Sequence, residues 1–396
     1  MTSVTPLEEM MFLITKYSVG SLATFITLAA ISIYLGAKKS KTPTTWWLLG
    51  YFGVLALLLF AYFLRYSILE IEGAYTGFMA NTIVFGVGCF AVFAYRLFDD
   101  ERPRERKIFT AIYFVASALV YGSNIFRPSG DLLFFNAPAH YYSIDWGSRV
   151  SIVTAFGFIW TIAVFFRRAA RSKGRRARSF QAFGGLATLT FLVSLLYLVM
   201  ELGFISRDVY AFGFNLGSLA ISVAIFGVYI NNSQETTSFQ VKLVGVPLAV
   251  VLFVLGIAGH AILGHYESSE RNRMAEVAAD AFKDDSSIRL PEVISSENGF
   301  IEEFSDFGFE ILDIRDQTSY SYLVPLGESE FRERVGYLEL RRRIHSIGVR
   351  MVATAFGATF LVLLLFLLCS AGASEFHFSH CSRACERWRK ETWMSG

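Results

Sequence analysis

The chain has 396 residues, of which 54% are hydrophobic and only 18% are charged, whereas soluble domains carry about 25% charged residues. Its mean hydropathy of +0.44 excludes an ordinary soluble protein. The net charge of +2 excludes a protein-wide field for nucleic-acid binding, so no nucleic-acid partner is expected. The composition therefore predicts an integral membrane protein.

Nine apolar runs come close to the length of about 20 residues that a membrane-spanning helix needs. In chain order they cover residues 17–37, 46–64, 75–95, 108–124, 150–166, 181–203, 209–230, 243–262 and 348–369. The one long connection is polar and charged, and it is long enough to fold as a small domain. The sequence predicts an all-α polytopic membrane protein, with a seven-helix bundle and two further transmembrane helices that flank a small α+β extracytoplasmic domain.

The predicted division of the chain follows these runs. It comprises the seven-helix module, the eighth helix, the extracytoplasmic domain, the ninth helix and a cytoplasmic tail, over residues 1–235, 236–262, 263–347, 348–369 and 370–396. Within the outer domain, residues 309–314 and 320–324 have strand character. Residues 338–343 are predicted to continue into the ninth helix, which would couple the outer domain mechanically to the membrane.

Lys and Arg are concentrated in the connections on one side of the membrane. The connections after the first, third, fifth and seventh runs carry 16 of them, against 5 on the opposite side before the eighth run. Because cytoplasmic loops carry this excess, we expect the N-terminus outside and the C-terminus inside. The basic connection 167–178 has no interleaved aromatic residue, so we expect it to set the topology and attract anionic membrane lipid.

Two segments and the order of elements resemble a known class of sensor. They are YINNSQETTSFQVKLVG at residues 229–245 and GYLELRRRIHSI at residues 336–347. They are similar to the input half of bacterial seven-transmembrane-module sensors, which continue through a HAMP linker into a histidine kinase, cyclase or phosphatase. The resemblance implies a signal-transduction receptor of the bacterial plasma membrane, a homodimer, and an unknown extracytoplasmic ligand.

The tail after Cys369 departs from this resemblance, because its apolar periodicity ends and His, Cys and Trp become frequent. Shifting the reading frame over residues 387–395 permits V-A-E-G-D-L-D-V, a HAMP-like ending. We therefore expect an out-of-frame tail and a sensor truncated before its catalytic output domain. The tail also has zinc-like spacing but lacks the second pair of elements that such sites bridge, so no metal is expected. That spacing involves His377, His380, Cys381 and Cys385.

Polar side chains inside the apolar runs mark a candidate ligand site. Glu201 and Arg65 lie near the outer ends of the sixth and second runs, and Asn81 and Asn215 lie in the third and seventh. An ionisable residue within an apolar run is a functional-site hypothesis by default. These four residues are predicted to line an outward-facing pocket above aromatic side chains. In the alternative, Glu201 reaches the headgroup layer and the asparagines only bind neighbouring helices.

Catalytic groups are scarce in the bundle. The first seven runs contain no histidine and the seventh contains no lysine, which argues against an intramembrane hydrolase and a retinal Schiff base. We expect a membrane sensory receptor with no enzymatic activity and no cofactor. A small-molecule transporter is the alternative, although it would call for broken helices and the first seven runs contain no proline. Gly213 and Gly217 form a G-x-x-x-G pattern that predicts helix packing within the bundle.

Overall fold

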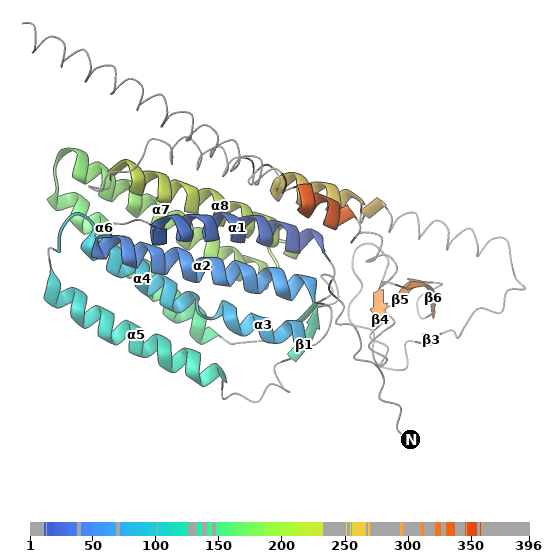
Figure 1. The fold of residues 1–396 in the computed structure, drawn as a ribbon. Coiled ribbons are helices and arrows are strands. Elements are labelled where there is room, and N and C mark those ends of the chain that lie inside the picture. Colours follow the sequence, from blue (N-terminus) through green and yellow to red (C-terminus); the bar gives the residue numbers. More distant parts are fainter. Residues whose placement is uncertain are drawn as a thin grey trace, which may run out of the picture.

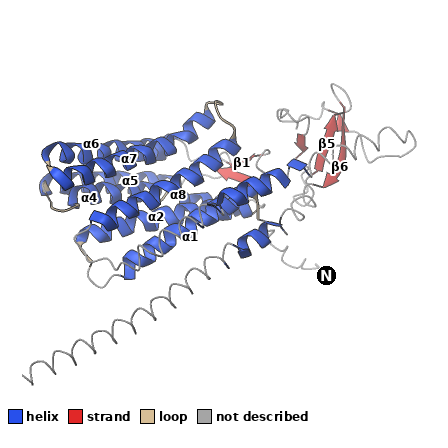
Figure 2. Ribbon diagram, turned by 90° about the horizontal axis from the view of Figure 1, so that it is seen from above, coloured by secondary structure: helices blue, strands red, loops and turns tan. Residues whose placement is uncertain are grey.

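The computed structural model shows a bundle of long helices lying side by side (Figure 1). It describes residues 12, 14–37, 41–68, 72–100, 102–125, 133–136, 141–144, 148–232, 251, 254, 256–266, 268–269, 294–295, 310–312, 321–325, 330–336, 345, 347–354 and 357. The helices are α1 (Lys16–Ala37), α2 (Pro43–Ser67), α3 (Glu72–Ala80), α4 (Ile83–Arg96), α5 (Pro103–Ile125), α6 (Ser148–Arg171), α7 (Gly174–Glu201) and α8 (Arg207–Asn232). A hairpin of β1 (Leu133–Asn136) and β2 (Tyr141–Ile144) follows α5 at one end of the bundle (Figure 2).

Six helical stretches of the described residues are long and apolar enough to cross a membrane. They are α1, α2, Tyr75–Arg96 (α3 and α4 together), and most of α6, α7 and α8. Six of the first seven predicted runs are thereby confirmed, and the chain is a multi-pass helical membrane protein. Helices α6 and α7 extend beyond their apolar runs to Arg171 and back to Gly174, since long basic side chains can end a membrane helix by reaching toward water.

Helix α5 contains the fourth predicted run but is not among these six, because its apolar part, residues 108–124, is short. Its exposed face is nevertheless apolar. The relative exposures of Ile108, Ile112, Val115 and Leu119 are 61%, 64%, 59% and 68%. Their spacing of four, three and four residues places them on one side of the helix. Within a membrane bundle, such a stripe faces lipid.

The third run is broken within the membrane segment rather than continuous. A turn at Asn81–Thr82 separates α3 from α4. The amides of Asn81 and Thr82 donate to the carbonyls of Phe78 and Met79 at 3.2 Å each, which is the tighter three-residue pattern. The Thr82 hydroxyl also donates to the Met79 carbonyl at 2.6 Å. Short polar side chains compete for the backbone in this way, so the break is stabilised locally.

Aromatic side chains fill the core between α2, α4, α6 and α7. The rings of Tyr51 and Phe90 stack at 4.5 Å between centroids, and Phe183 lies 5.3 Å from Phe93 and 5.6 Å from Phe165. Such pairs stabilise a core beyond their buried area.

Glycines set the closest helix approaches. A Cβ at Gly213 would lie 3.3 Å from Leu196, and one at Gly217 would lie 2.7 Å from Val193. Both neighbours belong to α7. The G-x-x-x-G pattern therefore packs α8 against α7 inside the bundle, as predicted.

Arg168 is the buried cation that closes one end of the bundle, where α4 stops. Its guanidinium donates to the carbonyls of Ala94 and Tyr95 at 2.6 and 2.8 Å, and to the Asp99 carbonyl at 3.0 Å. It also pairs with the Asp99 carboxylate and lies 4.4 Å from the centroid of the Phe180 ring. Because only 3% of the side chain is exposed, these carbonyls depend on Arg168 rather than on water.

A second ionic group joins α5 to α6 at the same end. Glu105 accepts hydrogen bonds from Tyr95, Arg102 and Arg167 at 2.7, 2.9 and 2.6 Å. Trp160 donates to the Tyr95 hydroxyl at 2.9 Å. Burial alone would raise the pKa of Glu105, but the three donors lower it to about 2. The carboxylate is therefore ionised throughout the physiological range. We call residues 96–107 and 167–178 the arginine-rich end.

The outer connection contains short strands. β3 (Ile294–Ser295), β4 (Glu310–Leu312), β5 (Ser321–Pro325) and β6 (Glu330–Gly336) pair antiparallel in the order β3-β6-β5-β4. The predicted strands 309–314 and 320–324 overlap β4 and β5, whereas β6 was not predicted. Most of residues 263–347 lie outside the described part of the chain, so the α+β domain over these residues stays a prediction.

The eighth and ninth runs are described only in part. Residues 256–266 and 347–354 are helical. The rest of both runs, and the tail over 370–396, lie outside the described residues. The predicted orientation is likewise untested by the structure.

We expect Arg168→Met to lower the free energy of unfolding by about 3 kcal/mol, because it leaves buried carbonyls and Asp99 without their cation. Arg168→Lys should recover only part of this, since one ammonium cannot reproduce the planar fork of donors. Thermal unfolding of the full chain in detergent measures both. Arg178→Met, at an exposed position of α7, is the control. Equal stability of Arg168→Met and the wild type would contradict this role.

Candidate functional site

The end of the bundle opposite the arginine-rich end is rich in tyrosine. Tyr17, Tyr66 and Tyr210 are buried there together, and Tyr62 packs against them. Tyr17 and Tyr62 lie 5.6 and 6.0 Å from Tyr66 between ring centroids. Tyr197 lies 5.8 Å from Tyr210. We call these five residues, from α1, α2, α7 and α8, the tyrosine-rich end. Of the predicted site residues, Arg65 directly precedes Tyr66 of this cluster in α2.

Asn215 lies in α8 and ties this helix to α1. Its side-chain oxygen accepts a hydrogen bond from the Ser21 hydroxyl at 3.2 Å, and its backbone carbonyl accepts one from Thr24 at 3.3 Å. The helices approach closely here, because a Cβ at Gly20 would lie 3.1 Å from the Asn215 amide nitrogen. Asn215 is 8% exposed, so its hydrogen bonds hold two helices together.

Asn81 lies at a different interface. The rings of Phe78 and Phe85, three residues before it and four after it, lie 4.6 and 5.7 Å from Tyr121 of α5. This pattern turns the break between α3 and α4 toward α5. The structure therefore places Asn81 and Asn215 on separate interfaces, α3–α4 with α5 and α8 with α1.

The other two predicted residues lie at helix ends. Arg65 is in the last turn of α2, and Glu201 is the last residue of α7. The Glu201 side chain lies outside the described residues. A ligand-binding role for Glu201, Arg65, Asn81 and Asn215 stays a prediction.

Buried polar groups with unsatisfied donors accompany Asn81. The side-chain nitrogens of Asn81 and Asn124 and the hydroxyl of Ser117 have no hydrogen-bond partner among the described residues. These side chains are 6%, 3% and 0% exposed. Ser117 and Asn124 stand four residues before and three after Tyr121, so they share its face of α5. Three of the nine buried polar atoms that lack a hydrogen-bond partner in the described residues therefore lie on α5 or at the break between α3 and α4.

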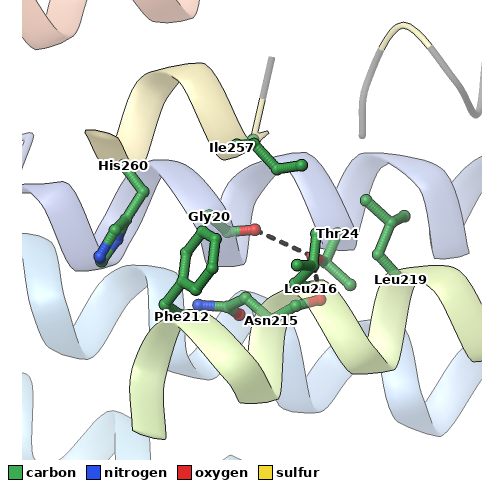
Figure 3. A pocket seen from close by; sticks show the side chains of 9 residues that line it. Gly20, Thr24, Phe212, Asn215, Leu216, Leu219, Ile257 and His260 are labelled. Carbon is green, nitrogen blue, oxygen red and sulfur yellow. Dashed lines mark hydrogen bonds between the residues drawn. The ribbon is translucent and has the colours of Figure 1, made fainter. Parts of the chain in front are cut away.

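A small cavity lies between α1, α8 and the helical residues 256–260 (Figure 3). Its volume is about 20 Å³, which is room for about one water molecule. It is lined by Gly20, Thr24, Phe212, Asn215, Leu216, Leu219, Gly256, Ile257 and His260. Among the residues that line the cavity, Asn215 and His260 carry the amide and imidazole groups that could bind a polar ligand. Of the predicted site residues whose side chains the structure describes, only Asn215 lines this cavity.

His260 was not predicted to belong to the site. Its ring lies 5.0 Å from Phe212 and 6.4 Å from Tyr17 between centroids. Its Nδ1 lies 3.3 Å from the carbonyl oxygen of Lys16. The available signal was a histidine inside the eighth apolar run, where an ionisable group is costly and marks function.

His345, which follows the outer connection in the chain, contacts the same segment as His260, which precedes it. The amide of Ile14 donates to His345 Nδ1 at 2.9 Å. Two glycines let both helical stretches approach residues 14–19, which we call the α1 start. A Cβ at Gly348 would lie 2.6 Å from Ile14, and one at Gly259 would lie 2.6 Å from Val19. The residues that flank the long outer connection therefore converge on one short segment.

Comparisons with known proteins identify no relative. No protein-family model matches the chain, and no curated protein or solved structure is significantly similar to it. The structure thus defines a class, a multi-pass helical membrane protein in contact with lipid, and the function must be argued from the geometry.

We expect Asn124→Leu to raise the free energy of unfolding by about 1 kcal/mol, because it removes a buried amide without a partner at nearly constant volume. Asn215→Leu is the matched comparison and should lower stability, because Ser21 loses its acceptor. Thermal unfolding of both variants in detergent gives the comparison. If Asn124→Leu destabilises the protein as much as Asn215→Leu does, the Asn124 amide has a partner.

Acidification should weaken the contact between His345 and the α1 start. Burial lowers the pKa of His345, so the folded protein favours the neutral ring that accepts from Ile14. A lowered histidine pKa stabilises the fold fully above the ordinary value near 6.5, and this stability is lost as the pH falls below it.

The melting temperature of the wild type should therefore fall more between pH 7.5 and pH 5 than that of His345→Gln, which keeps an acceptor that does not titrate. Lys16 and His260, the ionisable neighbours at the α1 start, are present in both proteins. Equal falls would show that His345 contributes nothing to the pH dependence.

Proposed function

We propose that the protein is a membrane sensory receptor, the input part of a bacterial signal transducer. The observation that carries the proposal is the convergence of residues 256–266 and 345–354 on the α1 start. Since these stretches flank residues 267–344, a cue received by that connection changes their contacts with α1. The receptor would act as a homodimer in the plasma membrane and would catalyse no reaction itself.

The contacts at the α1 start are suited to a switch. His260 and His345 each make one hydrogen bond there, to the Lys16 carbonyl and from the Ile14 amide. Each is worth about 1 kcal/mol net, so a modest stimulus can exchange them. A helix shift of this kind is the two-state element that an output domain reads. A ligand in the cavity beside His260 and Asn215 would bias the same contacts.

A chimera tests the coupling. Residues 1–369 are joined to the HAMP linker and kinase of a characterised sensor, and autophosphorylation is measured in membranes. Gly348→Leu should change the kinase activity by at least about threefold, because the new side chain displaces the ninth helix from Ile14 and shifts the two-state equilibrium. Val349→Leu is the matched control, because Val349 is 44% exposed. Equal activity of a well-expressed Gly348→Leu chimera and its parent would contradict the proposal.

A small-molecule transporter is the second candidate, and the break at Asn81–Thr82 favours it. Discontinuous membrane helices line substrate sites in transporters, and Asn81 in this break is buried with an unsatisfied amide. Reconstitution into proteoliposomes separates the two candidates. Accumulation of radiolabelled solutes that is abolished by Glu201→Gln would overturn the receptor proposal, whereas no uptake of any solute by the wild type supports it.

A further inference from the structure

A stripe on α5 joins a cation to an exposed apolar surface. Arg104, Ile108, Ile112, Val115 and Leu119 follow each other at intervals of four, four, three and four residues, so they lie on one side of the helix. The aliphatic side chains are 59–68% exposed, and Arg104 is exposed as well. A positive charge therefore stands directly beyond the end of a lipid-facing strip.

The carboxylates of the arginine-rich end are engaged by other arginines. Asp99 pairs with Arg168 and Arg176, and Asp100 pairs with Arg106. Glu105 pairs with Arg102 and Arg167. These pairs use every carboxylate of this end that the structure describes, so its remaining cations are not neutralised by them.

At the arginine-rich end, four exposed cations make neither an ion pair nor a side-chain hydrogen bond within the described part of the chain. They are Arg104 and Lys107 on α5, and Lys173 and Arg178 around the start of α7. The bonds from Arg167 to Glu105 and from Arg176 to Asp99 bring the two groups to the same end. A concentration of unpaired, solvent-facing cations at a membrane boundary attracts anionic headgroups, with about 1 kcal/mol for each cation.

We propose that Arg104 and Lys107 bind the phosphate of an anionic glycerophospholipid, whose acyl chain lies along Ile108, Ile112, Val115 and Leu119. The apolar strip favours this occupant over a soluble phosphate, because headgroup and chain are held by adjoining turns of one helix. Lys173 and Arg178 strengthen the field without contacting the acyl chain. This site is separate from the cavity beside His260 and does not depend on the receptor function.

Native mass spectrometry of the full chain in detergent tests the site, with dioleoylphosphatidylglycerol and dioleoylphosphatidylcholine as probes. We expect phosphatidylglycerol to bind at least about fivefold more tightly than phosphatidylcholine. Arg104→Gln should weaken its binding roughly fivefold, and the double variant with Lys107→Gln roughly twentyfold. Selectivity should fall with added salt, because the cations are exposed.

Arg149→Gln is the matched control, since Arg149 is an exposed cation of α6 at the other end of the bundle. It should leave the affinity unchanged, and all variants should unfold at the wild-type temperature in phosphatidylcholine. Equal affinities for the two lipids, or unchanged binding in the double variant, would overturn the proposal. Displacement of the lipid by millimolar glycerol 3-phosphate would overturn it too, by showing a site for the soluble headgroup alone.

Discussion

The arginine-rich end depends on the hydrogen bonds that the Arg168 guanidinium donates to backbone carbonyls. A helix that stops at the membrane boundary leaves carbonyls that lipid cannot satisfy, and Arg168 binds those of Ala94 and Tyr95. The chain then turns at Phe98, whose φ of +70° is costly for a side chain of this size. Phe98 is held in this conformation by its contact with Phe180 and by the grip of Arg168 on the next residue, Asp99. The path from α4 into α5 thus follows from one buried cation.

The two ends of the bundle are stabilised by different forces, and this difference matters for function. Several arginine–carboxylate pairs, with hydrogen bonds of 2.6–3.1 Å around Glu105 and Asp100, connect α4, α5 and α6 at one end. In the described residues, the tyrosine-rich end is held mainly by ring contacts, by Lys16 5.0 Å above the Tyr17 ring, and by hydrogen bonds between neutral groups such as Ser21 and Asn215. Charge-assisted bonds are roughly twice as strong as neutral ones, so motion is cheaper at the tyrosine-rich end. In the proposed receptor, a cue received at the tyrosine-rich end would move that end while the opposite end keeps its geometry.

Hydropathy was sufficient to predict the six spans found among the described residues, because lipid requires long apolar helices whatever their packing. It could not show the break at Asn81–Thr82, since apolar residues continue on both sides of that turn. Nor could it separate Asn81 from Asn215, because the rotation of each helix is set by contacts such as Phe78 with Tyr121 and Gly20 with Asn215. Strand β6 was not predicted, because its sequence EFRERVG has four charged residues and only two apolar ones. His260 could be suspected from its place in the eighth apolar run, but its contacts with Phe212 and the Lys16 carbonyl depend on helix packing.

The α1 start is where these separate features meet. Thr15 donates to the Tyr66 carbonyl of α2 at 3.1 Å. The residue before it, Ile14, donates its amide to His345, and the residue after it, Lys16, has its carbonyl 3.3 Å from His260. Three consecutive residues therefore contact α2 and both helical stretches that flank the outer connection. Ser18 closes the segment by accepting from the Thr15 amide at 2.8 Å. Since these bonds involve neighbouring residues, we expect a shift of either flanking stretch to change how α1 meets α2. In the proposed receptor, a shift of either flanking stretch would therefore reach α2 through residues 14–16.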